Sequence, residues 1–298
     1  MRRWLMVIGV VVGTVAVGLG SFIYTQLTQL EWKNVRGDVY LIQGLGGNVG
    51  VLKTSEGAVV VDTMTFPLQG ERIRALAEEL AGGPVIAVIN THYHRDHTHG
   101  NPSFESIPRF YATTKTKEHL LTSDTESWTG AAASTLPNEL IDDTRTIQIG
   151  GKTVTLSFLG RGHTDGDLVV HFVDDRVVHL GDLFFNKRYP RIDIAGGGSA
   201  QEWAATLDRA LEIEFERVIP GHGDIADAEG VRGFQRFLQD AFREVSKAKT
   251  AGLSLEQAQD TIELESDEGY GPGGLPPIVV LDFNGVVASI WDELSAQH

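Results

Sequence analysis

The chain has 298 residues, of which 42% are hydrophobic and 22% charged, as is ordinary for a globular protein with a full core. Its formal net charge of −15 argues against a nucleic-acid partner, because binding to phosphates requires a basic face. The sequence contains no cysteine, which excludes disulfides, cysteine nucleophiles and thiolate metal ligands. Any metal ion must therefore be held by imidazole and carboxylate groups, which suit zinc and also iron or manganese.

The N-terminal part is an apolar stretch. Residues from Trp4 to Tyr24 carry no charge, and Arg2 and Arg3 precede them. About 20 apolar residues cross a bilayer as a helix, and preceding arginines favour a cytoplasmic N-terminus with the rest exported. We therefore predict a signal peptide or membrane anchor over residues 1–27, with the rest of the chain on the extracytoplasmic side. No Ala-x-Ala cleavage site is present, which favours the anchor over a cleaved form that is secreted or periplasmic.

Short apolar and alternating segments follow, and they are separated by Gly-rich turns and by segments with helical spacing. Strands are predicted at residues 38–43, 49–53, 58–62, 85–89, 109–112, 146–149, 153–158, 168–173, 177–180, 217–219 and 278–283. Helices are predicted at residues 71–81, 201–213 and 231–251, and a further one opens at Ser254. The apolar run 58–62 suits a strand buried on both faces. Strand groups with helices between them indicate a layered α/β domain.

Metal-ligating residues are concentrated in the run Thr91-His92-Tyr93-His94-Arg95-Asp96-His97, directly after the predicted strand 85–89. His92 and His94 alternate, so on an extended segment they face the same side, and Asp96 and His97 follow as the chain turns. Nitrogen and oxygen donors packed this closely form a compact metal clamp.

Three more candidate ligands stand at turns or strand ends. His163 lies in a Gly-rich turn between two predicted strands. Asp182 lies where an apolar strand is predicted to break into a loop, and His222 lies in Pro-Gly-His-Gly after the strand 217–219. Rigid strands can bring such ends together at one site.

The order HxHxDH, GHT, GD and PGHG resembles the metallo-β-lactamase superfamily of metal-dependent hydrolases, over roughly residues 35–229. The resemblance implies an αββα sandwich of two mixed β-sheets flanked by helices, with the site along one edge. We accordingly predict a catalytic domain over 28–235, with helices and a final strand over 236–298 packing on the same domain.

The resemblance also implies a ligand set for two metal ions, zinc in the first instance. It assigns His92, His94 and His163 to the first ion, Asp96, His97 and His222 to the second, and Asp182 to both. Asp62 resembles the family's strand-end aspartate, which orients the ligand loop from beneath.

The implied reaction is hydrolysis of a small acyl compound. A hydroxide shared by the two metal ions attacks the carbonyl of an ester, thioester, lactone or amide, and Asp96 takes or passes the proton. Lys187, Arg188 and Tyr189 lie where the family's substrate-facing loops fall. They either hold a substrate carboxylate or oxyanion, or form an ordinary surface loop.

Two alternatives stay open. The first is a genuine β-lactamase, although many β-lactamases with three imidazoles at the first metal place Cys where Asp182 stands. The second is an iron-containing redox metalloprotein on the same fold, as in the flavodiiron proteins, which add a flavin domain.

Overall fold

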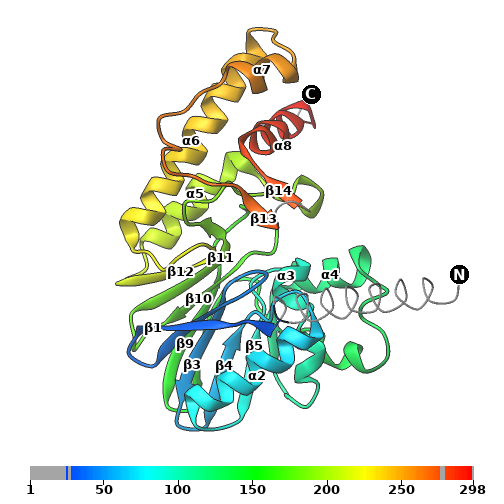
Figure 1. Ribbon diagram of the computed structural model, residues 1–298, viewed down its shortest axis with the longest axis vertical. Helices are drawn as coiled ribbons and strands as arrows, with labels where there is room; N and C mark the ends of the chain where they lie inside the picture. Colours follow the sequence, from blue (N-terminus) through cyan, green and yellow to red (C-terminus); the bar gives the residue numbers. More distant parts are fainter. Residues whose placement is uncertain (1–24, 26–27, 276–278, 297–298) are drawn as a thin grey trace, which may run out of the picture.

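Two β-sheets pack face to face between helices in this fold (Figure 1). The computed structural model describes residue 25 and residues 28–275 and 279–296. The predicted anchor or signal segment 1–27, apart from residue 25, lies outside the described residues. Among the helices that are described, none is both long and apolar enough to span a membrane.

The first sheet contains seven strands in sequence order. They are β1 (Glu31–Arg36), β2 (Val39–Gln43), β3 (Val49–Thr54), β4 (Gly57–Val61), β5 (Val85–Ile89), β6 (Phe110–Ala112) and β7 (Glu139–Leu140). Pairing is antiparallel from β1 to β4 and parallel from β4 to β7, with helix α2 (Pro67–Ala81) connecting β4 to β5. Strand β1 was not predicted, because it is a largely exposed edge strand without the apolar alternation of a buried one.

The second sheet contains five strands in the order β12-β11-β10-β9-β8. They are β8 (Thr144–Ile149), β9 (Lys152–Phe158), β10 (Leu168–Phe172), β11 (Val177–Phe185) and β12 (Arg217–His222). Only the β11–β12 pair is parallel, and helix α5 (Ala200–Leu211) lies in its connection. The predicted pair of mixed sheets flanked by helices is therefore confirmed.

The main core lies between the two sheets, and strand β4 shows how the layers are divided. Val59 and Val61 pack into this core together with Leu156 of the second sheet. Val60 faces the other way and packs against Ile73 of α2. The predicted burial of this strand on both faces is confirmed.

The C-terminal part packs on α5 and, through its first helix, on the second sheet. It consists of α6 (Ala228–Thr250), α7 (Leu255–Thr261) and α8 (Phe283–Ala296), which share a core with α5. Helix α6 passes through residues 235 and 236, where we predicted the catalytic part to end. Glu293 of α8 accepts hydrogen bonds from Ser199 Oγ (2.5 Å) and the Ala200 amide (2.8 Å), so α8 caps the start of α5.

The predicted last strand 278–283 is shorter in the structure. Residue 278 lies outside the described residues, and among residues 279–283 the strand β14 (Val279–Leu281) is extended and pairs with β13 (Gly273–Leu275) in a separate two-stranded sheet. The strand ends because Asp282 Oδ1 accepts a hydrogen bond from the Gly285 amide (2.9 Å) and begins helix α8.

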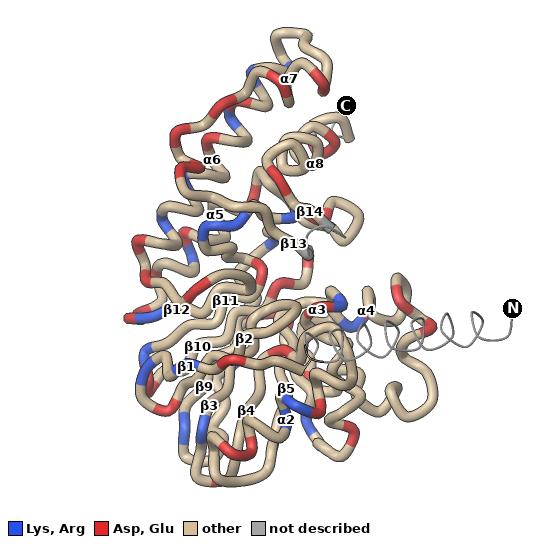
Figure 2. Tube along the Cα trace, viewed as in Figure 1, with Lys and Arg blue, Asp and Glu red and all other residues tan. Residues whose placement is uncertain are grey.

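Shorter helices occupy the remaining connections. They are α3 (Arg95–Thr98), η1 (Asn101–Phe104), α4 (Thr114–Ser123), η2 (Gly130–Thr135) and η3 (Ile194–Gly196). Asp and Glu residues are spread over many elements, α6 and α7 among them, so the negative charge is distributed over the molecule (Figure 2).

Candidate metal centre

The turn after β5 delivers four candidate ligands, and Asp62 holds this turn in place. Asp62 is fully buried at the end of β4. It accepts hydrogen bonds from the Thr91 amide (2.8 Å), Thr91 Oγ1 (2.7 Å) and His97 Nδ1 (2.7 Å). The bond to Nδ1 leaves His97 Nε2 free to point into the site. This is the contact expected of a residue that orients the ligand loop.

The second sheet contributes His163, Asp182 and His222. His163 follows β9, and its Nδ1 donates to the Arg191 carbonyl (2.7 Å), so Nε2 faces the site. His222 ends β12. Contrary to our prediction of a loop, Asp182 lies within β11, which runs on to Phe185 because all its later side chains are buried.

Gly181 explains how a strand residue reaches the site. Its φ of +51° and the shift in β11–β12 register around it turn the strand locally. A Cβ at this position would lie 2.6 Å from Cβ of Thr91, so only glycine allows the two sheets to approach here.

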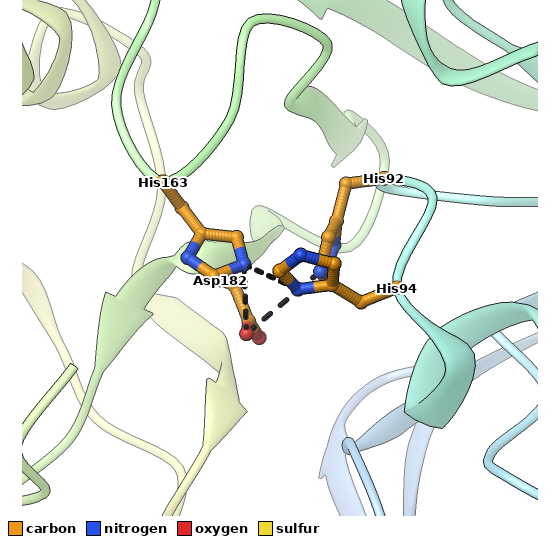
Figure 3. Close-up of side chains that lie close together, drawn as sticks. All are labelled: His92, His94, His163 and Asp182. Atoms are coloured by element: carbon orange, nitrogen blue, oxygen red, sulfur yellow. Dashed lines mark hydrogen bonds and ion pairs between the residues drawn. The ribbon is translucent and has the colours of Figure 1, made fainter. Parts of the chain in front are cut away.

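The seven predicted ligands converge in two groups. The first contains His92, His94, His163 and Asp182 (Figure 3), and the second contains Asp96, His97 and His222; within each group one donor atom per residue lies within 4.8 Å of the others. Asp182 faces both groups. Its Oδ2 is 3.4 Å from His163 Nε2, and its Oδ1 is 3.1 Å from His97 Nε2 and 3.5 Å from His222 Nε2.

Buried atoms without hydrogen-bond partners show that this donor set fits metal ions. His92 Nε2, His97 Nε2 and Asp182 Oδ1 are buried and form no hydrogen bond. Leaving such atoms unsatisfied costs about 1–3 kcal/mol each, unless a cation completes them. Imidazole and carboxylate donors at this density suit zinc, iron or manganese. The residues are therefore compatible with two ions, and the assignment of each ligand stays a prediction.

The charges of the site are arranged for a cation. Burial alone would raise the pKa of the Asp182 carboxyl, but the imidazoles around it, His97 first, hold that pKa well below its usual range. Burial would lower the pKa of His222, but the Asp182 and Asp96 carboxylates raise it to about 9. Burial also lowers the pKa of His163 to about 3, so its imidazole is neutral. An ionised carboxylate thus lies beside a neutral ligand nitrogen.

A cavity of about 530 Å³ opens onto the donors. Asp96, the predicted catalytic residue, lines it together with four other candidate ligands, His94, His163, Asp182 and His222. Leu45, Phe66, Phe185 and Leu281 form apolar parts of its wall. The donors are therefore accessible to a small molecule from one side.

The predicted substrate residues Lys187, Arg188 and Tyr189 lie outside this cavity. Lys187 Nζ donates to the Glu268 carbonyl (2.8 Å), and Tyr189 OH donates to Asp267 Oδ2 (2.9 Å). Arg188 lines a neighbouring polar cavity with Lys187. These side chains contact the C-terminal segment, and the neighbouring cavity includes the candidate ligand His222 in its wall, so their role in substrate binding stays a prediction.

Two residues near the donors were not predicted. Asp193 Oδ2 is 2.7 Å from His94 Nε2 and also accepts a hydrogen bond from Tyr93 OH. Asp193 thus fixes the imidazole ring of His94, whose Nδ1 faces His163. Arg191 lines the cavity. Both lie in a loop without apolar periodicity, and nothing in the local sequence marks them as neighbours of the site.

The family is shown by its sequence profile. The profile of the Metallo-beta-lactamase superfamily matches residues 42–222, which is more than half of the chain and includes all seven candidate ligands. The chain therefore belongs to the metallo-β-lactamase superfamily, whose enzymes are hydrolases.

Individual relatives are distant. Metallo-beta-lactamase IND-1 of Chryseobacterium indologenes is 29% identical over 178 residues, covering 58% of this chain and 70% of that protein. Metallo-beta-lactamase type 2 of Bacillus cereus is 23% identical over 211 residues, covering 70% and 79%.

Solved structures share the fold. A metallo-beta-lactamase from Pontibacter korlensis has a TM-score of 0.60 at 20% identity, over 71% of this chain and 99% of that chain. A double mutant of the sec-alkyl sulfatase PisA1 has a TM-score of 0.67 at 14% identity, over 89% of this chain and 50% of that chain. At such identities the likeness concerns the fold alone.

Proposed function

We propose that this protein is a dizinc hydrolase of small esters, thioesters, lactones or amides. The observation that carries this proposal is the convergence of seven imidazole and carboxylate side chains around buried, partnerless donor atoms. Since the sequence has no cysteine, a cysteine nucleophile is excluded, and the donor set favours metal-dependent chemistry.

Each ligand has a defined place in this proposal. His92, His94 and His163 would hold one ion, Asp96, His97 and His222 the other, and Asp182 would contact both. Two ions of this kind supply a Lewis acid for the acyl oxygen and a hydroxide nucleophile at neutral pH.

The chain supplies orientation and proton transfer. Asp62 and Asp193 fix the rings of His97 and His94 from outside the ligand set. Asp96 is half-buried, lines the cavity and has its Oδ2 3.2 Å from His222 Nε2. A carboxylate at this position can accept a proton from the attacking water and pass it to the leaving group.

The experiment combines metal analysis with a substrate screen. Purified protein should contain close to two metal ions per chain and should hydrolyse at least one of the lactones, thioesters and esters tested. His94→Ala and Asp96→Ala should abolish this hydrolysis, whereas the matched His171→Ala, on β10 and away from the ligands, should not. Full activity in the metal-free protein would refute the proposal.

A β-lactamase is the second candidate function, and the names of several relatives favour it. It requires that the same donors act on a cyclic amide, with Asp182 in place of the cysteine that many such enzymes carry. A chromogenic cephalosporin distinguishes the two functions. Turnover far above background would establish the lactamase, and its absence together with ester hydrolysis would exclude it.

We further propose that the protein is exported and anchored at the membrane with its catalytic part on the extracytoplasmic side. The support is the uncharged stretch from Trp4 to Tyr24 behind Arg2 and Arg3. Cell fractionation should place the full chain with the membranes, and a variant without residues 4–24 in the soluble fraction. A mature protein that begins near Ser21 would show cleavage instead of anchoring.

A further inference from the structure

The wall of the catalytic cavity is completed by a part of the chain that lies outside the family match. The superfamily profile ends at His222, yet Gly274 and Leu281 line the cavity that contains the candidate ligands. Both residues belong to the small sheet β13–β14 between α7 and α8 (Figure 1). The shape of this cavity therefore depends on a C-terminal addition as well as on the shared core.

The segment preceding β13 is fastened to the loop after β11. The Tyr189 amide donates to the Gly271 carbonyl (3.2 Å), and the Gly271 amide donates to the Lys187 carbonyl (3.0 Å). The Tyr189 hydroxyl and the Lys187 ammonium add the side-chain contacts to Asp267 and Glu268 described above, and the ammonium also lies 5.0 Å from the centre of the Tyr270 ring. Lys187 and Tyr189 thus position the segment, which explains why their side chains do not reach the donors.

Part of the cavity wall is apolar, beside the polar lining residues Arg95, Asp124 and Arg191. Leu281 contributes from β14, Leu45 and Phe66 from loops of the first sheet, and Phe185 from the end of β11. Phe66 is 40% exposed, so its ring is accessible to a molecule that enters the cavity. An acyl chain that packs against these four side chains gains free energy by leaving water.

We infer that the cavity selects acyl compounds by their apolar acyl chain, and that Leu281 is a determinant of this selectivity. The inference rests on the proposed hydrolase function and adds the substrate class. The carbonyl lies at the donors, and the chain extends along Leu281, Phe66 and Leu45. Each methylene buried there raises kcat/KM by about fourfold, so a hexanoyl ester exceeds an acetyl ester by on the order of 100-fold.

The test uses the full chain loaded with zinc and a series of p-nitrophenyl esters from acetyl to decanoyl. Leu281→Gln should reduce the ratio of hexanoyl to acetyl kcat/KM by about tenfold, because an amide group then faces the chain. Leu281→Phe should move the optimum to shorter chains, because it narrows the cavity. Val280→Gln is the matched control: Val280 is the neighbour on the same strand, is 52% exposed and does not line the cavity, so the ratio should stay that of the wild type.

The outcomes separate this inference from the function on which it rests. If no ester, thioester, lactone or amide is hydrolysed in a metal-dependent way, the proposed function itself fails. If esters are hydrolysed at rates that do not depend on chain length, or if Leu281→Gln and Val280→Gln behave alike, the function stands and the inference is overturned. Equal thermal unfolding midpoints for the two variants establish that the comparison concerns the cavity and not the fold.

Discussion

Asp62 fixes the protonation pattern of the second group of ligands. His97 Nδ1 donates a hydrogen bond to Asp62 Oδ2, which leaves Nε2, 3.1 Å from Asp182 Oδ1, as the ring atom available to a metal ion. Asp62→Asn preserves the size of the side chain, and asparagine tolerates the φ of +65° at this position. Its amide nitrogen, however, donates where the carboxylate accepted. His97 must then accept at Nδ1 and carry its proton on Nε2, where a metal would bind.

The expected size of the effect follows from these contacts. Loss of an orienting carboxylate behind an imidazole ligand weakens metal binding by roughly 10–100-fold. The larger loss should concern the second ion, because Asp62 reaches the first group only through Thr91 Oγ1, which lies 3.1 Å from His92 Nδ1. Asp62→Ala is the harsher change, because it leaves the Thr91 amide, the Thr91 hydroxyl and His97 Nδ1 buried without an acceptor. It should lower the free energy of unfolding by at least about 3 kcal/mol.

The assay is a zinc titration against a chromogenic chelator, with urea unfolding measured on the same samples. Asp260→Asn, the same chemical change at an exposed position on α7, serves as the control. The reasoning is refuted if Asp62→Asn binds both ions with the affinity of the wild type. It is also refuted if both ions are weakened equally, because Asp62 touches the ring of only one ligand.

Three further predictions concern the same site. Asp193→Ala removes the acceptor 2.7 Å from His94 Nε2, so a zinc titration should show that the affinity for the first ion falls by roughly 10–100-fold. A titration like that of the wild type would contradict this role. Zinc at 100 times its dissociation constant should raise the free energy of unfolding by about 2.7 kcal/mol for each ion bound, and a chelator should reverse this gain and stop hydrolysis. Unfolding curves that coincide with and without zinc would be the contrary result. In the metal-free protein the pKa of His222 is raised to about 9, against 6.5 in the unfolded chain. Protonated His222 therefore stabilises the fold fully below pH 6.5, and this stabilisation is lost as the pH rises through 9. Urea unfolding should show this loss, on the order of 3 kcal/mol, and His222→Gln should flatten it; parallel pH profiles would argue against the assignment.

The sequence was most informative where a ligand run adjoins a buried strand. Val85–Ile89 is a continuous apolar run, and the histidine run follows it directly, so both the strand and the clamp could be predicted together. Asp182 was found by its motif but was placed in a loop, because the register change at Gly181 that keeps it in β11 depends on the neighbouring strand.

Residues that reach the site only through tertiary packing could not be predicted from the sequence around them. Asp193 reaches His94 from a loop about one hundred residues further along the chain, and Leu281 reaches the cavity from beyond the family match. Lys187, Arg188 and Tyr189 illustrate the opposite case. Their residue types suit substrate binding, yet the contacts of Lys187 and Tyr189 are made with a segment about 80 residues later in the sequence.

The division of the ligands between the two sheets has a consequence for biosynthesis. The clamp after β5 leaves the ribosome long before His163 and Asp182, and His222 is the last donor to be made. His222 reaches its position only when β12 has paired with β11. This parallel pairing forms late, because helix α5 lies between the two strands in the sequence. A nascent chain can therefore hold at most a partial set of ligands. If the site holds two ions, as proposed, binding of both would indicate that the second sheet has been completed.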